Sequence, residues 1–197
     1  MNIKLRVFVL SFFMFGPAFA HEANSLPYGP FLGGITHPVL GFDHLLAMVS
    51  VGMISAQIGG RAIWKVPSTF VVVMFIGGLI GLNIGGLGGY EIGIALSVLL
   101  LGSALAADKT LNSIFAMIAV GIFAIFHGYA HGEEIPSIAR PTPYIAGFMM
   151  GTILLHITGL ILADISTHYK SGKIILRLAG TGIALAGFYF LITAFYE

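Results

Sequence analysis

The feature that most constrains the fold is a series of six long apolar runs that follow residue 30. They cover about residues 31–58, 67–87, 90–107, 111–130, 144–163 and 174–195. Each run approaches the roughly 20 residues that an α-helix needs to cross a bilayer. The breaks between them contain glycine, proline or charged residues, and none is long enough to separate two domains. The sequence therefore predicts an all-α membrane protein with six transmembrane helices in one domain, residues 21–197.

Composition supports the membrane class and narrows the chemistry. The chain is 57% hydrophobic and only 9% charged, whereas soluble domains are roughly 45–50% apolar and about 25% charged. A net charge of +1 indicates no nucleic-acid-binding surface. Cysteine is absent, which excludes disulfides, thiolate metal sites and cysteine nucleophiles. A metal would have to bind through histidine, carboxylate or methionine, so the seven histidines are the residues to follow.

Residues 1–20 have the pattern of a secretory signal peptide. A positive segment, "MNIKLR", precedes the short apolar core "VFVLSFFMF", and Ala18-Phe19-Ala20 forms an A-x-A cleavage site. The alternative is an uncleaved membrane helix, but the apolar core is well short of the roughly 20 residues required. We expect cleavage after Ala20, which would make His21 the first mature residue, outside a bacterial inner membrane.

The distribution of lysine and arginine predicts the orientation. With the mature N-terminus outside, the outer segments hold only Arg140. The inner segments hold Arg61, Lys65, Lys109, Lys170, Lys173 and Arg177. This is a positive-inside bias, and it agrees with the predicted signal peptide. We therefore expect both mature termini to be periplasmic.

The first apolar run contains "THPVLGFDHLLAM", which places His37, Asp43 and His44 inside the membrane. His37 and His44 are seven residues apart, or about 10.5 Å along a regular helix. That is too far for both to bind one ion, unless Pro38 and Gly41 distort the helix. Asp43 is adjacent to His44 and is positioned to orient its imidazole or to bind beside it.

The fourth run ends in "FHGYAHGEE", which holds two histidines and two glutamates. His127, His131 and Glu134 follow one another at spacings of four and three, so they share one helix face if the helix continues. Histidines at i and i+4 suit a divalent transition metal, whereas Glu133 points elsewhere. The predicted topology places this cluster at the outer end of the helix, at a depth similar to that of His37.

Two further histidines are candidates with evident alternatives. His156 lies near the middle of the fifth run, close to the expected depth of His44. It is either a ligand on an inward route or a packing residue. His21, at the predicted mature terminus, would chelate a metal through its α-amine and imidazole, with Glu22 nearby. The alternative is that His21 is a flexible terminal residue. For the first-run and fourth-run groups, chance packing is a poor explanation, because ionisable groups in membranes cost several kcal/mol unless paired or hydrated.

The two motifs resemble those of the HupE/UreJ family of bacterial membrane proteins. The family pattern H-x5-D-H is met by His37, Asp43 and His44. The longer pattern F-H-G-x-A-H-G-x-E is met by Phe126, His127, Gly128, Ala130, His131, Gly132 and Glu134. The resemblance implies a secondary permease for nickel or cobalt, ligand roles for the motif residues, and a functional link to hydrogenase or urease maturation. It requires no cofactor beyond the transported Ni²⁺ or Co²⁺.

Two other functions use the same residues. One is an intramembrane hydrolase, in which histidine-bound zinc activates water, although the sequence shows no clear serine or general-base companion. The other is a b-type haem protein with two axial histidines. The sequence contains no G-x-x-x-x-G-K-[ST] motif, so ATP hydrolysis by that route is excluded.

Overall fold

The computed structural model describes residues 29–108, 111–135 and 140–196. Helices are the only regular secondary structure in these ranges. The seven described helices are α2 (Gly29–Leu40), α3 (Phe42–Ile58), α4 (Ala62–Asn83), α5 (Tyr90–Ala107), α6 (Ser113–Glu134), α7 (Pro141–Thr167) and α8 (Gly172–Thr193). The all-α prediction is confirmed for this part of the chain. The expected signal peptide and His21 lie outside the described residues.

Five of these helices, α4 to α8, are long and apolar enough to cross a membrane. The first predicted span is not one continuous helix, because α2 and α3 meet at an angle of 82°. Pro38 lies near the end of α2, and Gly41 between the helices has an extended backbone with φ −81° and ψ 105°. Proline lacks the N–H of a regular helix and crowds the preceding turn, which favours a break at this point. The pair brings the number of candidate spans to six if it counts as one.

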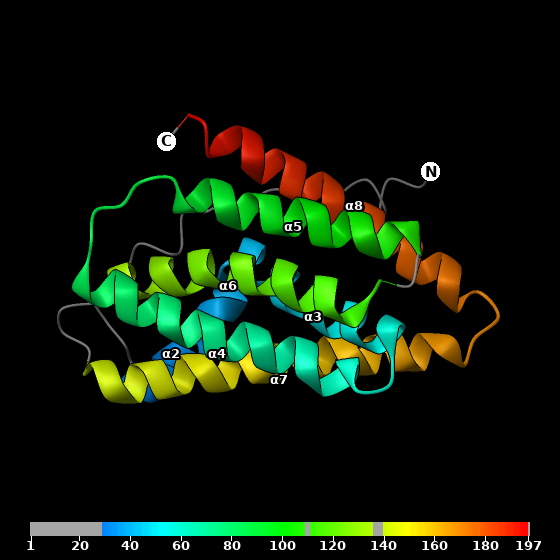
Figure 1. The fold of residues 1–197 in the computed structure, drawn as a ribbon, viewed down its shortest axis with the longest axis horizontal. Helices are drawn as coiled ribbons and strands as arrows, with labels where there is room; N and C mark the ends of the chain where they lie inside the picture. The colour runs from blue at the N-terminus through cyan, green and yellow to red at the C-terminus, as the bar shows by residue number, and fades with distance from the viewer. Residues whose placement is uncertain (1–28, 109–110, 136–139, 197) are drawn as a thin grey trace, which may run out of the picture.

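The helices pack in three close pairings (Figure 1). α4 packs on α6, α5 on α8, and the broken pair α2 and α3 on α7. Glycines bring the backbones together: a Cβ on Gly128 of α6 would collide with the backbone of Met74 and Gly78 on α4. A Cβ on Gly52 of α3 would likewise collide with the backbone of α7 at His156. Without a hydrophobic driving force between helices in lipid, such close approach is a main source of stability.

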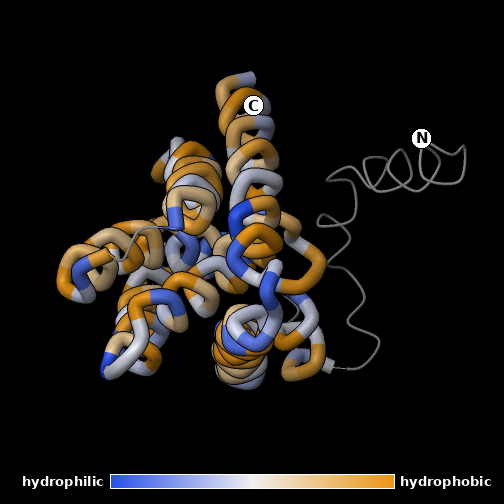
Figure 2. Tube along the Cα trace, turned by 90° about the vertical axis from the view of Figure 1, so that its right-hand side faces the viewer, coloured by the Kyte–Doolittle hydropathy of each residue, from blue (hydrophilic) through white to orange (hydrophobic). Residues whose placement is uncertain are grey.

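Hydrophobic residues predominate along the helices, with scattered hydrophilic positions (Figure 2). Large side chains on the outside remain exposed, among them Phe115 at 72% and Leu178 at 67%, as expected for surfaces that contact lipid. The interior includes Phe70 and Met74 of α4, and it also contains polar groups. The buried side chains of this kind include four histidines, His44, His127, His131 and His156. A membrane interior that holds so many imidazoles calls for a chemical explanation.

Candidate metal centre

The break between α2 and α3 forms one wall of the candidate site. Asp43 Oδ1 accepts a hydrogen bond from the backbone N–H of His44 at 2.7 Å and lies 2.7 Å from His44 Nδ1. A Cβ at Gly41 would lie 3.2 Å from both Asp43 Oδ1 and His44 Nδ1. Glycine at this position therefore leaves room for the Asp43–His44 pair.

The same break brings His37 and His44 onto a common partner. The ring centroids of His37 and His131 are 4.9 Å apart, and those of His44 and His131 are 4.3 Å apart. In an unbroken helix, His37 and His44 would be separated by about 10.5 Å along the axis. The sequence alone did not decide whether Pro38 and Gly41 distort the helix. The structure shows that they do, and the distortion places both histidines beside α6.

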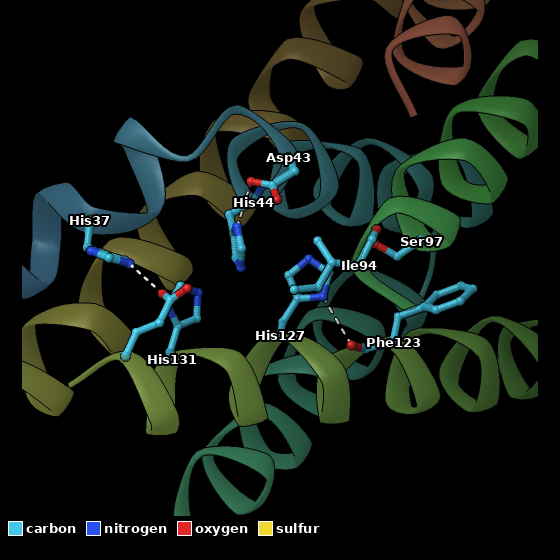
Figure 3. Close-up of polar contacts among 9 residues, drawn as sticks. His37, Asp43, His44, Ile94, Ser97, Phe123, His127 and His131 are labelled. Carbon is cyan, nitrogen blue, oxygen red and sulfur yellow. Dashed lines mark hydrogen bonds and ion pairs between the residues drawn. The ribbon is translucent and has the colours of Figure 1, made fainter. Parts of the chain in front are cut away.

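Three side chains meet at the mouth of the site (Figure 3). Glu134 Oε2 lies 3.5 Å from His37 Nε2 and 3.7 Å from His131 Nδ1. One ligand atom from each residue lies within 4.8 Å of the others. The Glu134 side chain is 45% exposed, whereas that of His131 is only 6% exposed. The group therefore has a solvent-accessible carboxylate outside and buried imidazole inside.

A second pair of histidines continues the cluster inward. The rings of His44 and His127 are 4.8 Å apart, and Figure 3 shows them facing each other. His127 Nδ1 lies 3.0 Å from the Phe123 carbonyl oxygen, which only accepts a hydrogen bond, so Nδ1 carries the proton. His127 Nε2 then presents a lone pair, and the Asp43 contact has the same effect on His44. A partner that fixes one ring nitrogen while freeing the other is typical of metal-binding histidines.

Most of the buried side-chain polar atoms without a hydrogen-bond partner in the described structure are imidazole nitrogens. Among the described side chains there are eight such atoms, and six are imidazole nitrogens: His44 Nε2, His127 Nε2, and both nitrogens of His131 and of His156. A buried group left unpaired costs about 1–3 kcal/mol. Four of these six nitrogens, on His44, His127 and His131, lie in the cluster, which indicates that it is arranged to meet a ligand.

The remaining predicted residues fall outside this cluster. Glu133 accepts a hydrogen bond from the backbone N–H of Gly86 at 2.6 Å, which confirms that it points elsewhere. His156 is buried on α7 but is separated from His127 by the ring of Phe70. Phe70 was missed in the sequence, because nothing distinguishes it among 16 phenylalanines.

These helices and this cluster define a multi-pass membrane protein with a centre of imidazoles, most of them buried, beside partly exposed carboxylates. A family model described as HupE / UreJ protein matches residues 9–190. The chain is 43% identical over 171 residues to Protein HupE of Rhizobium leguminosarum bv. viciae, covering 87% of this chain and 89% of that protein. The chain therefore belongs to the HupE/UreJ family. No solved structure gives a significant match.

Proposed function

We propose that this chain is a secondary transporter that takes up nickel(II), or alternatively cobalt(II), across the bacterial inner membrane. The observation that carries the proposal is the group formed by His37, His131 and Glu134, with ligand atoms within 4.8 Å of one another at the mouth of a membrane helix bundle. Membership of a family of membrane transporters supports it. The metal ion is the cargo, and the proposal requires no resident cofactor.

The chemistry of the side chains favours a divalent transition metal. Imidazole and carboxylate suit nickel and cobalt, whereas Cu(I) prefers sulfur ligands, and this chain has no cysteine. With their carboxyls ionised, Asp43 and Glu134 supply two negative charges beside the imidazole ligands. Two negative charges balance a +2 ion, which limits the cost of bringing it into a membrane protein.

The direction of transport follows from charge and from the electrical potential. α7 begins at the Glu134 end of the bundle and finishes at the opposite end, where the exposed Lys170 and Lys173 follow it. This placement supports a site that opens to the periplasm, with positive loops in the cytoplasm. A +2 ion moving inward through 100 mV gains about 4.6 kcal/mol, from about 2.3 kcal/mol for each charge. Uptake therefore does not need nucleotide hydrolysis.

The geometry also bears on the other functions considered. Imidazole rings with centroids 4.3 to 4.9 Å apart are in mutual contact and leave no space for a porphyrin between them, which favours a small ion over haem. The zinc hydrolase gains no support from the described residues or from the relatives. The imported nickel would be supplied to a hydrogenase or a urease, and this use is part of the proposal.

The test is accumulation of labelled nickel and labelled cobalt in cells that lack other uptake systems. His131→Ala and His44→Ala should lower accumulation strongly, because each removes an imidazole from the cluster. His168→Ala is the matched control, because this exposed histidine at the end of α7 lies outside the cluster and its imidazole is within hydrogen-bond distance of the Asp164 carbonyl oxygen one turn earlier. Undiminished accumulation in both cluster variants would contradict the transport site.

A further inference from the structure

One aromatic ring separates the histidine cluster from a deeper histidine. Phe70, near the middle of α4, is fully buried. Its ring centroid lies 5.4 Å from that of His127 and 5.2 Å from that of His156. The two histidines come from different helices, α6 and α7, and each meets the phenylalanine ring at a steep angle of 66° and 88°, respectively. Phe70 thus contacts two imidazoles that come from different helices.

His156 has polar neighbours of its own one helical turn toward the Glu134 end of the bundle. Thr152 lies one turn before His156 on the same face of α7, and Met74 lies one turn after Phe70 on α4. Thr152 Oγ1 is 3.9 Å from Met74 Sδ. The pairs Phe70–Met74 and Thr152–His156 therefore face each other across α4 and α7. They bring an imidazole, a hydroxyl and a thioether into one buried location, where none of the four side chains is more than 3% exposed.

The alternative is that His156 is only a packing residue. Both of its ring nitrogens are buried without a hydrogen-bond partner among the described residues. Leaving such groups unpaired costs about 1–3 kcal/mol each, and a leucine of similar size would fill the space without that cost. A purely structural role therefore does not explain why an imidazole is here.

We propose that His156, with Thr152 and Met74 one turn toward the outer end, forms a second binding station for the transported cation, deeper than His127, and that Phe70, which contacts both histidines, controls passage from His127 to His156. The inference rests on the proposed transport function. It assigns a binding role to three residues of the interior and a gating role to the aromatic ring between them.

The two stations differ in charge and depth. The outer one includes the carboxylates of Asp43 and Glu134, whereas the inner one is built from neutral donors, so it binds a divalent cation more weakly. Weak binding on the inner side permits release, which conduction through successive sites requires. His156 lies eight residues beyond Phe148, the neighbour of His131 on α7, or about 12 Å deeper along the helix.

Phe70 suits a gate because it blocks the path without trapping the ion. Its ring contacts the rings of both His127 and His156, so rotation of this single side chain would open a route from one imidazole to the other. The face of an aromatic ring attracts cations, so the passing ion meets a less unfavourable surface than an aliphatic side chain would present.

The inner station is tested with His156→Leu, which removes both nitrogens and keeps the bulk. Purified protein is assayed for nickel binding by equilibrium dialysis and for nickel uptake in proteoliposomes. We expect one fewer ion bound per chain and a maximal uptake rate at least about tenfold lower, with the half-saturating concentration little changed, because the outer station remains. His168→Leu, at the residue that follows α7, should show the wild-type binding stoichiometry and maximal uptake rate. His156→Gln, which keeps a polar side chain, serves if the leucine variant does not elute as a folded protein.

The gate is tested with Phe70→Ala in vesicles preloaded with nickel. Removing the ring should speed the loss of nickel at least about threefold, whereas Phe115→Ala on the exposed side of α6 should leave it unchanged. Wild-type stoichiometry and maximal rate in the His156 variants would overturn the inner station, and wild-type exchange in Phe70→Ala would overturn the gate. A wild-type protein without nickel flux would instead refute the proposed transport function.

Discussion

The glycine beside His131 allows a quantitative test of how tightly the site is positioned. A Cβ added at Gly132 would lie 2.8 Å from the Leu82 backbone nitrogen and 3.0 Å from the Gly78 carbonyl carbon on α4. Ordinary contacts begin at 3.4 Å, so Gly132→Ala requires α6 to move from α4 by at least roughly 0.6 Å. The Gly78 carbonyl oxygen is closer still, and all three obstacles are backbone atoms, which cannot rotate out of the way.

This displacement is large compared with what a metal site tolerates. Ligand distances in such sites hold to within about 0.2 Å, and His131 is the residue next to the substitution. We expect nickel affinity to fall by about 10- to 100-fold, the range seen when supporting groups of metal ligands are lost. Overpacking should also destabilise the protein by about 1–3 kcal/mol. Isothermal titration with nickel and thermal unfolding in detergent measure the two effects.

The matched control is Gly182→Ala in α8, where an added Cβ meets nothing within 4 Å. Replacing a glycine inside a helix by alanine at an open position should stabilise the protein by about 0.5–1 kcal/mol, with unchanged nickel affinity. The same chemical change is thus expected to act with opposite sign at the two positions. If Gly132→Ala retained the affinity and stability of the wild type, the argument that backbone contact between α4 and α6 positions His131 would be refuted.

Two further predictions concern the same helix. Glu134→Gln should lower nickel affinity about tenfold or more by removing the carboxylate between His37 and His131. Glu133→Gln keeps an oxygen that can accept the backbone hydrogen bond, so it should leave nickel affinity unchanged. Equal losses of affinity in the two variants would contradict the assignment of Glu134 as the ligand. Tyr129→Phe should lower Tm, because its hydroxyl donates to the Ile84 carbonyl and accepts from the Leu87 N–H, both at 2.8 Å. Each such hydrogen bond contributes about 0.5–1.5 kcal/mol. An unchanged Tm would show that water satisfies both backbone groups.

The sequence predicted the helical class and singled out the residues that the structure brings together, because both depend on local signals. Apolar runs of membrane length are recognisable without knowledge of packing. The spacing of His127, His131 and Glu134 predicts a common face, and in the structure His131 and Glu134 do meet His37. Glu133 was correctly set aside by the same helical geometry.

What the sequence did not predict depends on contacts between distant segments. Pro38 and Gly41 indicated a distortion but not its size, because the packing of α2 and α3 on α7 decides whether the helix kinks or breaks. Phe70 acquires its position only through the packing of α4 beside both His127 and His156. An apolar side chain within an apolar run carries no signal of such a position.

The glycine contacts have a mechanical consequence for the cluster. Glycines fasten α6 to α4, and other glycines fasten α7 to α2 and α3. The cluster is divided between these two assemblies: His127, His131 and Glu134 belong to the first, and His37, Asp43 and His44 to the second. Any small rotation of one assembly against the other would change every distance across the cluster at once and leave each half intact. Relative motion of the two assemblies would therefore change the affinity of the cluster for an ion.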